Sequence, residues 1–480
     1  MDMLIDGAWV RASDGAVDPV TNPATGVVID TVPRATGQDV GRAVAAAVLA
    51  KTAMEALPAY RRYEILESVA RRIEANQPAL ALLLARENGK RIGETTSEIG
   101  VTARIFRGYA EEAKRNFGRS FPLDSIPGRE HSLAITMRRP LGVVVAIVPF
   151  NYPAELWSHK VAGGLAAGNA VITKTPEDCP LVVLEIARYI DEAGLPRGAH
   201  QVVTGGRDVG EALVRSPGVD MIAMTGSTAA GRRILEVAAG TLKKVHLELG
   251  GNDATIVCDD AEIDETADAL VTGRFTSGNG QICCAVKRVL VARAIYEPLL
   301  AAVTERTKTL RLGDPTSEST DVGPLINRRA AERVEAQVQR ALADGATLVT
   351  GGHRHDNFYE PTILTGVVPH TPAFEEETFG PVLPLIPYDD FETALALAND
   401  SPFGLQAAIF TRDLRRVMRA YEVLDVGTVI VNHTTAVRVE TLPFGGNKLS
   451  GKGREGIHDT LQEMTKQKTL LLHEVFGGAA

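Results

Sequence analysis

The residues that could carry chemistry lie in two stretches rich in glycine near the middle of the chain. Cys283 follows the turn-forming residues 277–280, and Glu248 comes directly before a leucine and two glycines. A cysteine thiolate is a strong nucleophile, and a carboxylate can act as a general base on water. We therefore interpret Cys283 as a nucleophile and Glu248 as the base that later activates water. The alternative for any single cysteine is a small buried apolar residue.

Length and composition limit the class of protein. A chain of 480 residues is too long for one hydrophobic core, so we expect two or three domains. Hydrophobic residues make up 45% and charged residues 23%, which is typical of a soluble globular protein. The formal net charge of −9 and the lack of a long Lys/Arg block argue against a nucleic-acid partner.

Cysteine content and the apolar segments indicate the compartment. Four cysteines (Cys179, Cys258, Cys283 and Cys284) are too few for a disulfide framework and fit a reducing cytosol, so we expect a cytoplasmic protein. The first residues do not resemble a secretion signal, and the most apolar run, residues 143–150, is too short to span a bilayer. We therefore expect no membrane partner.

The first third of the chain predicts strands followed by helices. Residues 4–33 alternate short apolar runs with turn residues and predict small strands and hairpins. Apolar residues at helical spacing predict helices at 38–50, 60–76, from Pro78 onward, and at 99–116. Residues 121–139 combine turn residues with an alternating pattern, which predicts either a projecting hairpin arm or an ordinary surface hairpin.

From residue 140 the pattern alternates strands and helices. The continuous apolar run at 143–148 is typical of a strand buried on both faces of a parallel sheet. Further strands are predicted at 170–173, 201–203 and 221–224, with helices at 153–167, 181–193, 209–215 and 229–239. Such alternation predicts a doubly wound α/β domain, which binds ligands beyond the carboxyl ends of its strands. Residues 296–431 repeat the alternation and predict a second α/β domain, and residues 468–474 could form a final strand.

Several segments could bind a dinucleotide cofactor. Residues 451–456 match the GxGxxG pattern, but they follow no clear strand and precede no βαβ unit, so we reject them. Residues 446–452 lack the Ser or Thr that a phosphate loop needs. Residues 225–231 follow a short strand and open a helix, which suits phosphate binding but also describes a plain connection.

Three polar residues end predicted strands. Lys174 and Glu177 could bind ribose hydroxyls, or they could be a solvated loop pair. Glu177 would repel a 2′-phosphate and so favours NAD over NADP. Lys174 could instead attract that phosphate and favour NADP. Asn151 could donate its amide N–H to a developing oxyanion, or it could simply stabilise a turn.

Taken together, these residues resemble the aldehyde dehydrogenase superfamily, and the match runs essentially from end to end. Each motif is modest alone, but the ordered set is highly specific. In chain order the matching segments are residues 149–151, Lys174 with Glu177, residues 226–228, 248–251, 280–283, 377–381 and 443–446.

The resemblance implies an α/β fold with two doubly wound α/β domains, one binding the cofactor and one catalytic, plus a β-strand oligomerisation arm. The implied cofactor-binding domain spans residues 1–120 and 141–247, the catalytic domain 248–445, and the arm 121–140 and 462–480. Members of the family form dimers or tetramers, so we expect a homodimer or homotetramer. The family's cofactor site lacks GxGxxG, which agrees with our rejection of residues 451–456.

The resemblance also implies a reaction. Cys283 attacks the carbonyl of an aldehyde substrate, the Asn151 amide and the Cys283 backbone N–H hold the oxyanion, and a thioester forms after hydride transfer to NAD. Glu248 then activates the water that releases a carboxylic acid. NAD is the expected cofactor, NADP is the alternative, and no metal is expected. The implied cofactor-binding residues are Phe150, Lys174, Glu177, Gly226, Ser227, Glu377 and Phe379.

The substrate is less well defined by the sequence. Arg438 stands six positions before Phe444, where many relatives have an aromatic residue, and His159 stands near the expected mouth of the substrate path. We hypothesise that Arg438 binds the carboxylate, phosphate or sulfonate of a short polar aldehyde. Alternatively, Arg438 pairs with Glu440 or points outward, and the substrate is neutral or aromatic. The expected substrate-contacting residues are Tyr152, His159, Ile282, Cys284, Arg438 and Phe444.

Three other functions compete with this interpretation. Glu248, Lys174 and Cys283 are the residue types of a nitrilase-like Cys hydrolase, which the ordered motifs disfavour. A CoA-acylating dehydrogenase usually lacks the base that Glu248 supplies. A non-catalytic binding protein gives no reason for Cys283, Glu248 and Asn151 to occur together.

Overall fold

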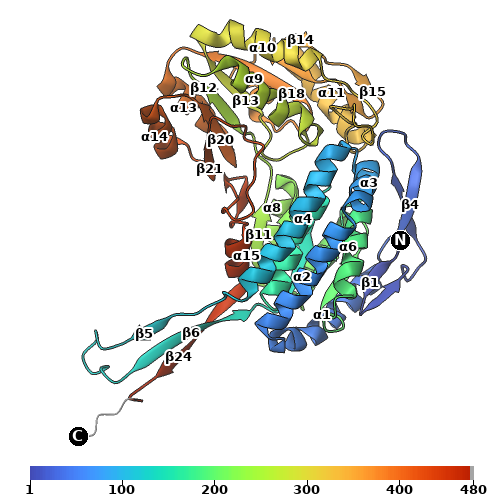
Figure 1. Ribbon diagram of the computed structural model, residues 1–480, viewed down its shortest axis with the longest axis vertical. Coiled ribbons are helices and arrows are strands. Elements are labelled where there is room, and N and C mark those ends of the chain that lie inside the picture. The colour runs from blue at the N-terminus through green and yellow to red at the C-terminus, as the bar shows by residue number, and fades with distance from the viewer. Residues whose placement is uncertain (476–480) are drawn as a thin grey trace.

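The computed structural model describes residues 1–475 as two α/β lobes and a narrow arm that projects away from both (Figure 1). The predicted α/β class is confirmed. Within the described residues, no helix combines the length and apolar character needed to cross a bilayer. Residues 476–480, the end of the expected arm, lie outside the described residues.

The first lobe is built on an eight-stranded sheet. Five parallel strands form its centre, and β1 and β23 pair antiparallel with its outer members. In spatial order the strands are β2 (Ala8–Val10), β1 (Met3–Ile5), β9 (His200–Val203), β8 (Ala170–Lys174), β7 (Val143–Ile147), β10 (Met221–Thr225), β11 (Lys244–Glu248) and β23 (Gly451–Lys452). The rejected GxGxxG segment thus begins as an antiparallel edge strand.

Helices surround this sheet (Figure 1). They are α1 (Gly37–Ala56), α2 (Ala59–Ala75), α3 (Gln77–Asn88), α4 (Ile92–Ala113), α5 (Pro153–Ala166), α6 (Leu181–Asp191), α7 (Arg207–Arg215), α8 (Thr228–Ala239) and α15 (Ile457–Glu463). Helix α4 starts at Ile92 rather than at residue 99 as predicted. Its first turns contain threonine and serine, which are weak helix formers, but Thr95 and Glu98 are buried and tertiary contacts hold them in the helix.

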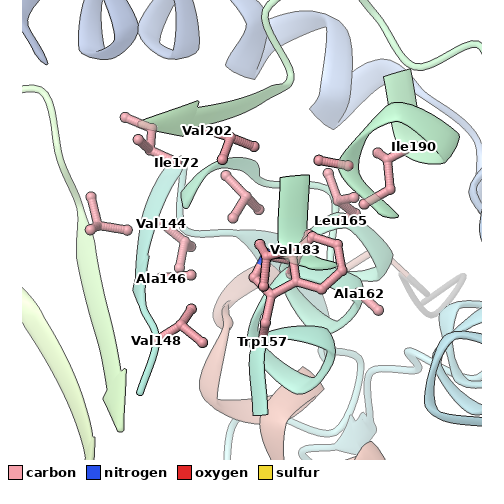
Figure 2. Close-up of a cluster of buried hydrophobic side chains, with 14 of the residues drawn as sticks. Val144, Ala146, Val148, Trp157, Ala162, Leu165, Ile172, Val183, Ile190 and Val202 are labelled. Atoms are coloured by element: carbon pink, nitrogen blue, oxygen red, sulfur yellow. The ribbon is translucent and has the colours of Figure 1, made fainter. Parts of the chain in front are cut away.

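The core of the first lobe confirms that β7 is covered on both faces. Val143 to Ala146 have no exposed surface, and Val144, Ala146 and Val148 lie close to Trp157 of α5 (Figure 2). The Trp157 indole N–H donates to Thr173 Oγ1 at 2.9 Å, which satisfies its polar atom inside the core.

The second lobe has a seven-stranded sheet. Its strands are parallel except for β14, in the order β14 (Thr347–Thr350), β17 (Thr362–Thr365), β18 (Val382–Tyr388), β13 (Arg288–Ala292), β12 (Ala254–Val257), β20 (Gln406–Phe410) and β21 (Thr428–Val431). The accompanying helices are α9 (Ile263–Val271), α10 (Tyr296–Lys308), α11 (Arg328–Ala343), α12 (Pro372–Glu375), α13 (Phe391–Asn399) and α14 (Leu414–Val423). The predicted second α/β unit is confirmed.

The arm is a three-stranded antiparallel sheet that joins distant parts of the chain. It contains β5 (Ser120–Pro122), β6 (Leu133–Pro140) and β24 (Thr465–Leu472), with Met137 opposite Lys468. The predicted hairpin is present, and the final strand begins at Thr465, earlier than predicted. Three two-stranded sheets complete the described fold: β3 (Val17–Thr21) with β4 (Val28–Pro33), β15 (Arg354–His355) with β16 (Phe358–Tyr359), and β19 (Phe403–Gly404) with β22 (Asn447–Lys448).

The strand order creates a ligand crevice in the first sheet. The chain runs outward from β7 through β8 to β9 and then returns to place β10 on the other side of β7. Doubly wound sheets bind ligands where the order reverses, outside the carboxyl ends of the strands. Asn151, Lys174, Gly226 and Glu248 all lie at or just beyond these carboxyl ends.

Candidate active site

The loop that carries Cys283 is fixed by side chains from other elements. A π-helical turn (Thr272–Thr276) extends α9, and a tight turn (Gly278–Gly280) follows. Asn279 has a left-handed φ of 52°, and its amide donates to the carbonyls of Gly89 and Pro324, each at 3.0 Å. These buried hydrogen bonds place the backbone that leads to Cys283.

Glu94 connects this loop to a predicted substrate residue. Its Oε1 accepts the Gly278 N–H at 2.7 Å and the Tyr152 hydroxyl. The Lys90 ammonium lies 3.6 Å from the centre of the Tyr152 ring. Glu94 was not predicted from the sequence, because it differs in no visible way from an acidic residue in the first turn of any helix.

A small apolar cluster surrounds the nucleophile. Ile282, Cys284 and Phe444 are buried together, and Tyr152 and Cys283 pack against them while remaining partly exposed. Four of the six predicted substrate residues thus meet around Cys283. The pKa of the Cys284 thiol is well above its usual value, because its hydrogen bond with Cys283 and its burial disfavour the thiolate. Cys284 is therefore suited to lining the pocket around Cys283 rather than to acting as a nucleophile.

Asn151 follows β7, and a hydrogen bond to the preceding residue, Phe150, fixes the backbone there. The Asn88 amide donates to the Phe150 carbonyl at 2.6 Å. Asn151 itself is 6% exposed, and its side-chain amide makes no hydrogen bond within residues 1–475. A buried amide without a partner can donate to an oxyanion that forms during a reaction.

Glu248 ends β11 and is almost fully buried. Burial raises the pKa of its carboxyl group, although a hydrogen bond from His246 acts in the opposite direction. The distance between His246 Nε2 and Glu248 Oε1 is 3.3 Å, whereas Oε2 is buried without a partner in the described chain. A carboxylate with a raised pKa is a stronger base, so this environment suits proton abstraction from water.

A cavity lies beside β7 and β10, where a doubly wound sheet binds its ligand. Apolar side chains form much of its wall, and the polar residues Lys174, Arg207, Glu211, Ser227 and Arg233 also line it. Ser227 caps α8 by accepting the Ala230 N–H at 3.3 Å, so the positive end of a helix opens into this cavity. A Cβ added at Gly226 would lie 2.4 Å from Met224 Cε, so a larger residue here would have to displace the end of the Met224 side chain.

The two predicted ribose residues have different environments. Burial lowers the pKa of Lys174, while Glu177 opposes this shift. Glu177 is exposed and lines a neighbouring cavity that also contains Asp178 and Asp208. The acidic lining of this second cavity disfavours an additional phosphate next to Glu177.

Glu377 and Phe379 reach the first lobe from the segment before β18. The rings of Phe150 and Phe379 meet edge to face, with centroids 5.9 Å apart. Glu377 Oε1 accepts the Gly251 N–H at 3.2 Å and the Lys287 ammonium at 2.8 Å. The structure therefore brings Glu377 and Phe379, two of the predicted cofactor-binding residues, to the junction of the lobes. Lys287, four residues after Cys283, was not predicted from the sequence.

Arg438 points into the protein, which corrects the two alternatives drawn from the sequence. Glu440 pairs with Arg104 at 3.3 Å instead, and Arg438 donates from Nη2 to Glu455 Oε1 at 2.8 Å. The Arg438 guanidinium lies 4.6 Å from the centre of the Phe444 ring. Its Nε and Nη1 are buried without partners in the described residues.

His159 is also placed differently from the prediction. The sequence put it near the mouth of the substrate path, but it is fully buried because α5 packs against α4 and α15. His159 Nδ1 shares a 3.0 Å hydrogen bond with the Tyr109 hydroxyl, and Nε2 has no partner among the described residues. Burial, followed by the nearby Arg438 charge, lowers its pKa well below the usual value, so the ring is neutral.

Glu455 is the carboxylate partner of Arg438, and it lies inside the GxGxxG segment, residues 451–456, that we rejected as a cofactor site. Its two carboxylate oxygens contact Arg438 at 2.8 Å and Lys160 at 2.7 Å.

No cluster of three or more His, Cys, Asp or Glu side chains in the described residues has the arrangement of a metal site.

Comparison with known proteins agrees with this geometry. A sequence model of the aldehyde dehydrogenase family matches residues 9–470. The 3-sulfolactaldehyde dehydrogenase of Priestia aryabhattai is 40% identical over 473 residues, which cover 98% of each chain. An NADP-dependent succinate-semialdehyde dehydrogenase of Escherichia coli is 38% identical over 94% of each chain. The structure of aldehyde dehydrogenase 21 from Physcomitrella patens with the product succinate matches with a TM-score of 0.96 and 34% identity, covering 99% of this chain and 98% of that one.

The hydrogen bond between His246 and Glu248 predicts a pH effect. Because this bond lowers the pKa of Glu248 against the effect of burial, His246→Leu should raise that pKa further. A general base works when ionised, so the rise of kcat with pH should move to higher pH. His246→Gln keeps a hydrogen-bond donor and should move it less. Equal pH profiles for wild type and His246→Leu would contradict the prediction.

Proposed function

The chain belongs to the aldehyde dehydrogenase family, and we propose that it oxidises a short anionic aldehyde to a carboxylic acid with NAD, or alternatively NADP. The observation that carries the substrate proposal is the buried guanidinium of Arg438, in which two nitrogens, Nε and Nη1, lack partners in the described residues and which stacks on Phe444 in the wall around Cys283.

The side chains account for each step of the oxidation. The Cys283 thiolate attacks the aldehyde carbon, and the Asn151 amide together with the Cys283 backbone N–H stabilises the oxyanion. A nicotinamide cofactor bound in the crevice would supply the hydride acceptor for the substrate carbon, and the acyl group would then remain on Cys283 as a thioester. Glu248 takes a proton from water, the resulting hydroxide attacks the thioester, and the carboxylic acid leaves as the thiolate reforms.

The proposed cofactor contacts follow the crevice of the first sheet. Ser227 and the N-terminus of α8 would hold the pyrophosphate, with Gly226 allowing a close approach. Lys174 and Glu177 would contact the adenosine ribose. On the nicotinamide side, Glu377 would hold the ribose, and Phe150 and Phe379 would flank the ring.

The charge around Arg438 supports an anionic group on the substrate. Arg438 and Lys160 share the single carboxylate of Glu455, and the adjacent carboxyl of Glu155 has its pKa raised to about 7 by burial. A guanidinium that is partly buried and incompletely paired favours an additional anion. The relatives named 3-sulfolactaldehyde and succinate-semialdehyde dehydrogenase act on aldehydes with a sulfonate or a carboxylate.

Substituting Arg438 tests the substrate class. Arg438→Leu should lower kcat/KM for aldehydes that carry a carboxylate or sulfonate by about 10-fold to 100-fold, because a hydrogen bond to a charged group is lost. It should change kcat/KM for neutral aldehydes of equal length much less. The measurement is NADH absorbance across a matched panel of anionic and neutral aldehydes.

The exposed Arg104, which pairs with Glu440, offers a matched control. Arg104→Leu should leave the ratio of anionic to neutral kcat/KM unchanged. If Arg438→Leu also leaves this ratio unchanged, the substrate is not selected by Arg438 and the neutral or aromatic alternative gains support.

Glu177 provides a test of cofactor choice. The Glu177 carboxylate would repel a 2′-phosphate, and Glu177→Gln removes that charge while keeping the side chain's size. The variant should therefore raise kcat/KM for NADP relative to NAD, by several-fold because Asp178 and Asp208 keep the neighbouring cavity acidic. A constant ratio would show that Glu177 does not select the cofactor.

We also propose the domain division given by the sequence, with the arm (residues 121–140 and 462–480) as a contact between copies of the chain. Its support is the three-stranded sheet that projects from the lobes (Figure 1) and carries the exposed apolar residues Met137, Leu470 and Leu471. Exposed apolar side chains of this kind are typical of protein interfaces.

Charge substitutions in the arm test this contact. Met137→Glu combined with Leu471→Glu should lower the molar mass in solution, measured by light scattering, because two charges would be buried at the interface. Leu49→Glu, at an exposed position of α1, serves as the control. A mass that stays the same in the arm variant would place the interface elsewhere.

A further inference from the structure

Lys287 lies at the junction between the nucleophile and the proposed nicotinamide site. Its side chain is 2% exposed, although it carries a charge. The ammonium donates to the carbonyls of Cys283 and Gly251, and to Glu377 Oε1 at 2.8 Å. An ammonium has three donors, so these three oxygens satisfy it completely.

The contacts of Lys287 also fix the carboxylate of Glu377. Within the described residues, Glu377 Oε1 has two donors, the Lys287 ammonium and the Gly251 N–H. The side chain of Glu377 is 20% exposed, so part of the carboxylate still faces the crevice. The Lys287 ammonium also lies 6.0 Å from the centre of the Phe379 ring. Lys287 therefore contacts or borders both proposed nicotinamide-side residues.

We propose that Lys287 is a positioning residue that holds Glu377 in the orientation for binding the nicotinamide ribose and ties it to the backbone of Cys283. This inference rests on the proposed function, in which Glu377 binds that ribose. Because one buried ammonium bonds both Glu377 and the Cys283 carbonyl, the ribose ligand and the nucleophile keep a fixed relative position before the cofactor binds. Such preorganisation lowers the entropic cost of binding.

The inference predicts an effect limited to one half of the cofactor. Without Lys287, Glu377 keeps one donor, Gly251, and gains rotational freedom that binding must remove. The loss of one charge-assisted hydrogen bond corresponds to about a 10-fold weaker binding of NADH. The adenosine side lies at Lys174 and Ser227, which Lys287 does not contact, so the binding of ADP should not change.

The test compares Kd values for NADH, measured by its fluorescence, and for ADP, measured by competition. Lys287→Met should raise the Kd of NADH about 10-fold and leave that of ADP unchanged. Lys287→Gln keeps a neutral donor, is the milder variant if Lys287→Met does not fold, and should give a smaller rise. Thermal unfolding of each variant checks that the compared proteins are folded.

Lys448 offers a matched control. Its ammonium also donates to two backbone carbonyls, those of Asn399 at 3.0 Å and Ser401 at 3.2 Å, and approaches the carboxylate of Asp425. None of these partners belongs to the proposed site. Lys448→Met should therefore leave both Kd values unchanged, which separates the effect at Lys287 from the general loss of a bonded lysine.

A double-mutant cycle shows whether Lys287 acts through Glu377. In a Glu377→Gln background, Lys287→Met should add less than about threefold to the Kd of NADH, because coupled residues are not additive. The inference is overturned if the full effect persists in that background, if NADH and ADP weaken equally, or if NADH binding does not change. Failure of the folded wild-type protein to bind NADH would instead overturn the proposed function itself.

Discussion

The site depends on how the two sheets are joined. Glu248 is the last residue of β11 in the first sheet, and Ala254 is the first residue of β12 in the second. Residues 249–253 connect these two strands directly, so the carboxyl end of β11 is held next to the amino end of β12. The carboxyl edge of the first sheet provides a crevice with helix N-termini and polar strand ends. The second edge supplies the loops that lead to Cys283 and Glu377, and neither edge is complete by itself.

This short connection requires glycine because other groups approach its backbone closely. A Cβ at Gly250 would lie 2.2 Å from Glu377 Oε2, and one at Gly251 would lie 2.7 Å from the Cys283 carbonyl oxygen. Real Cβ atoms do not occur at such distances, so a larger residue would push the nucleophile or the carboxylate away. The two glycines thus matter for the approach of neighbouring groups more than for backbone flexibility.

The local pattern of the sequence was enough to predict β7 to β10 of the first sheet, most helices and the residues at strand ends, but it gave no strand at β12, β13, β17 or β18 of the second sheet. It was also enough to reject the GxGxxG segment, which is an edge strand here. It could not predict the partners of those residues, since a contact such as that of Glu94 with Gly278 joins segments 184 positions apart. The same limit explains the errors at Arg438, whose carboxylate partner is Glu455 rather than the nearby Glu440, and at His159, whose burial depends on how α5 packs.

Glu455, Lys160 and Arg438 form a buried network of charges. Burial alone would raise the pKa of Glu455, but Lys160 and Arg438 lower it strongly, so this carboxylate remains ionised. The two cations therefore share one permanent negative charge. Removing two cations from water is costly when they are incompletely paired, and apolar side chains would stabilise the core better. The anionic substrate group that we propose would offset part of this cost by pairing with Arg438 Nε and Nη1, which lack partners in the described residues.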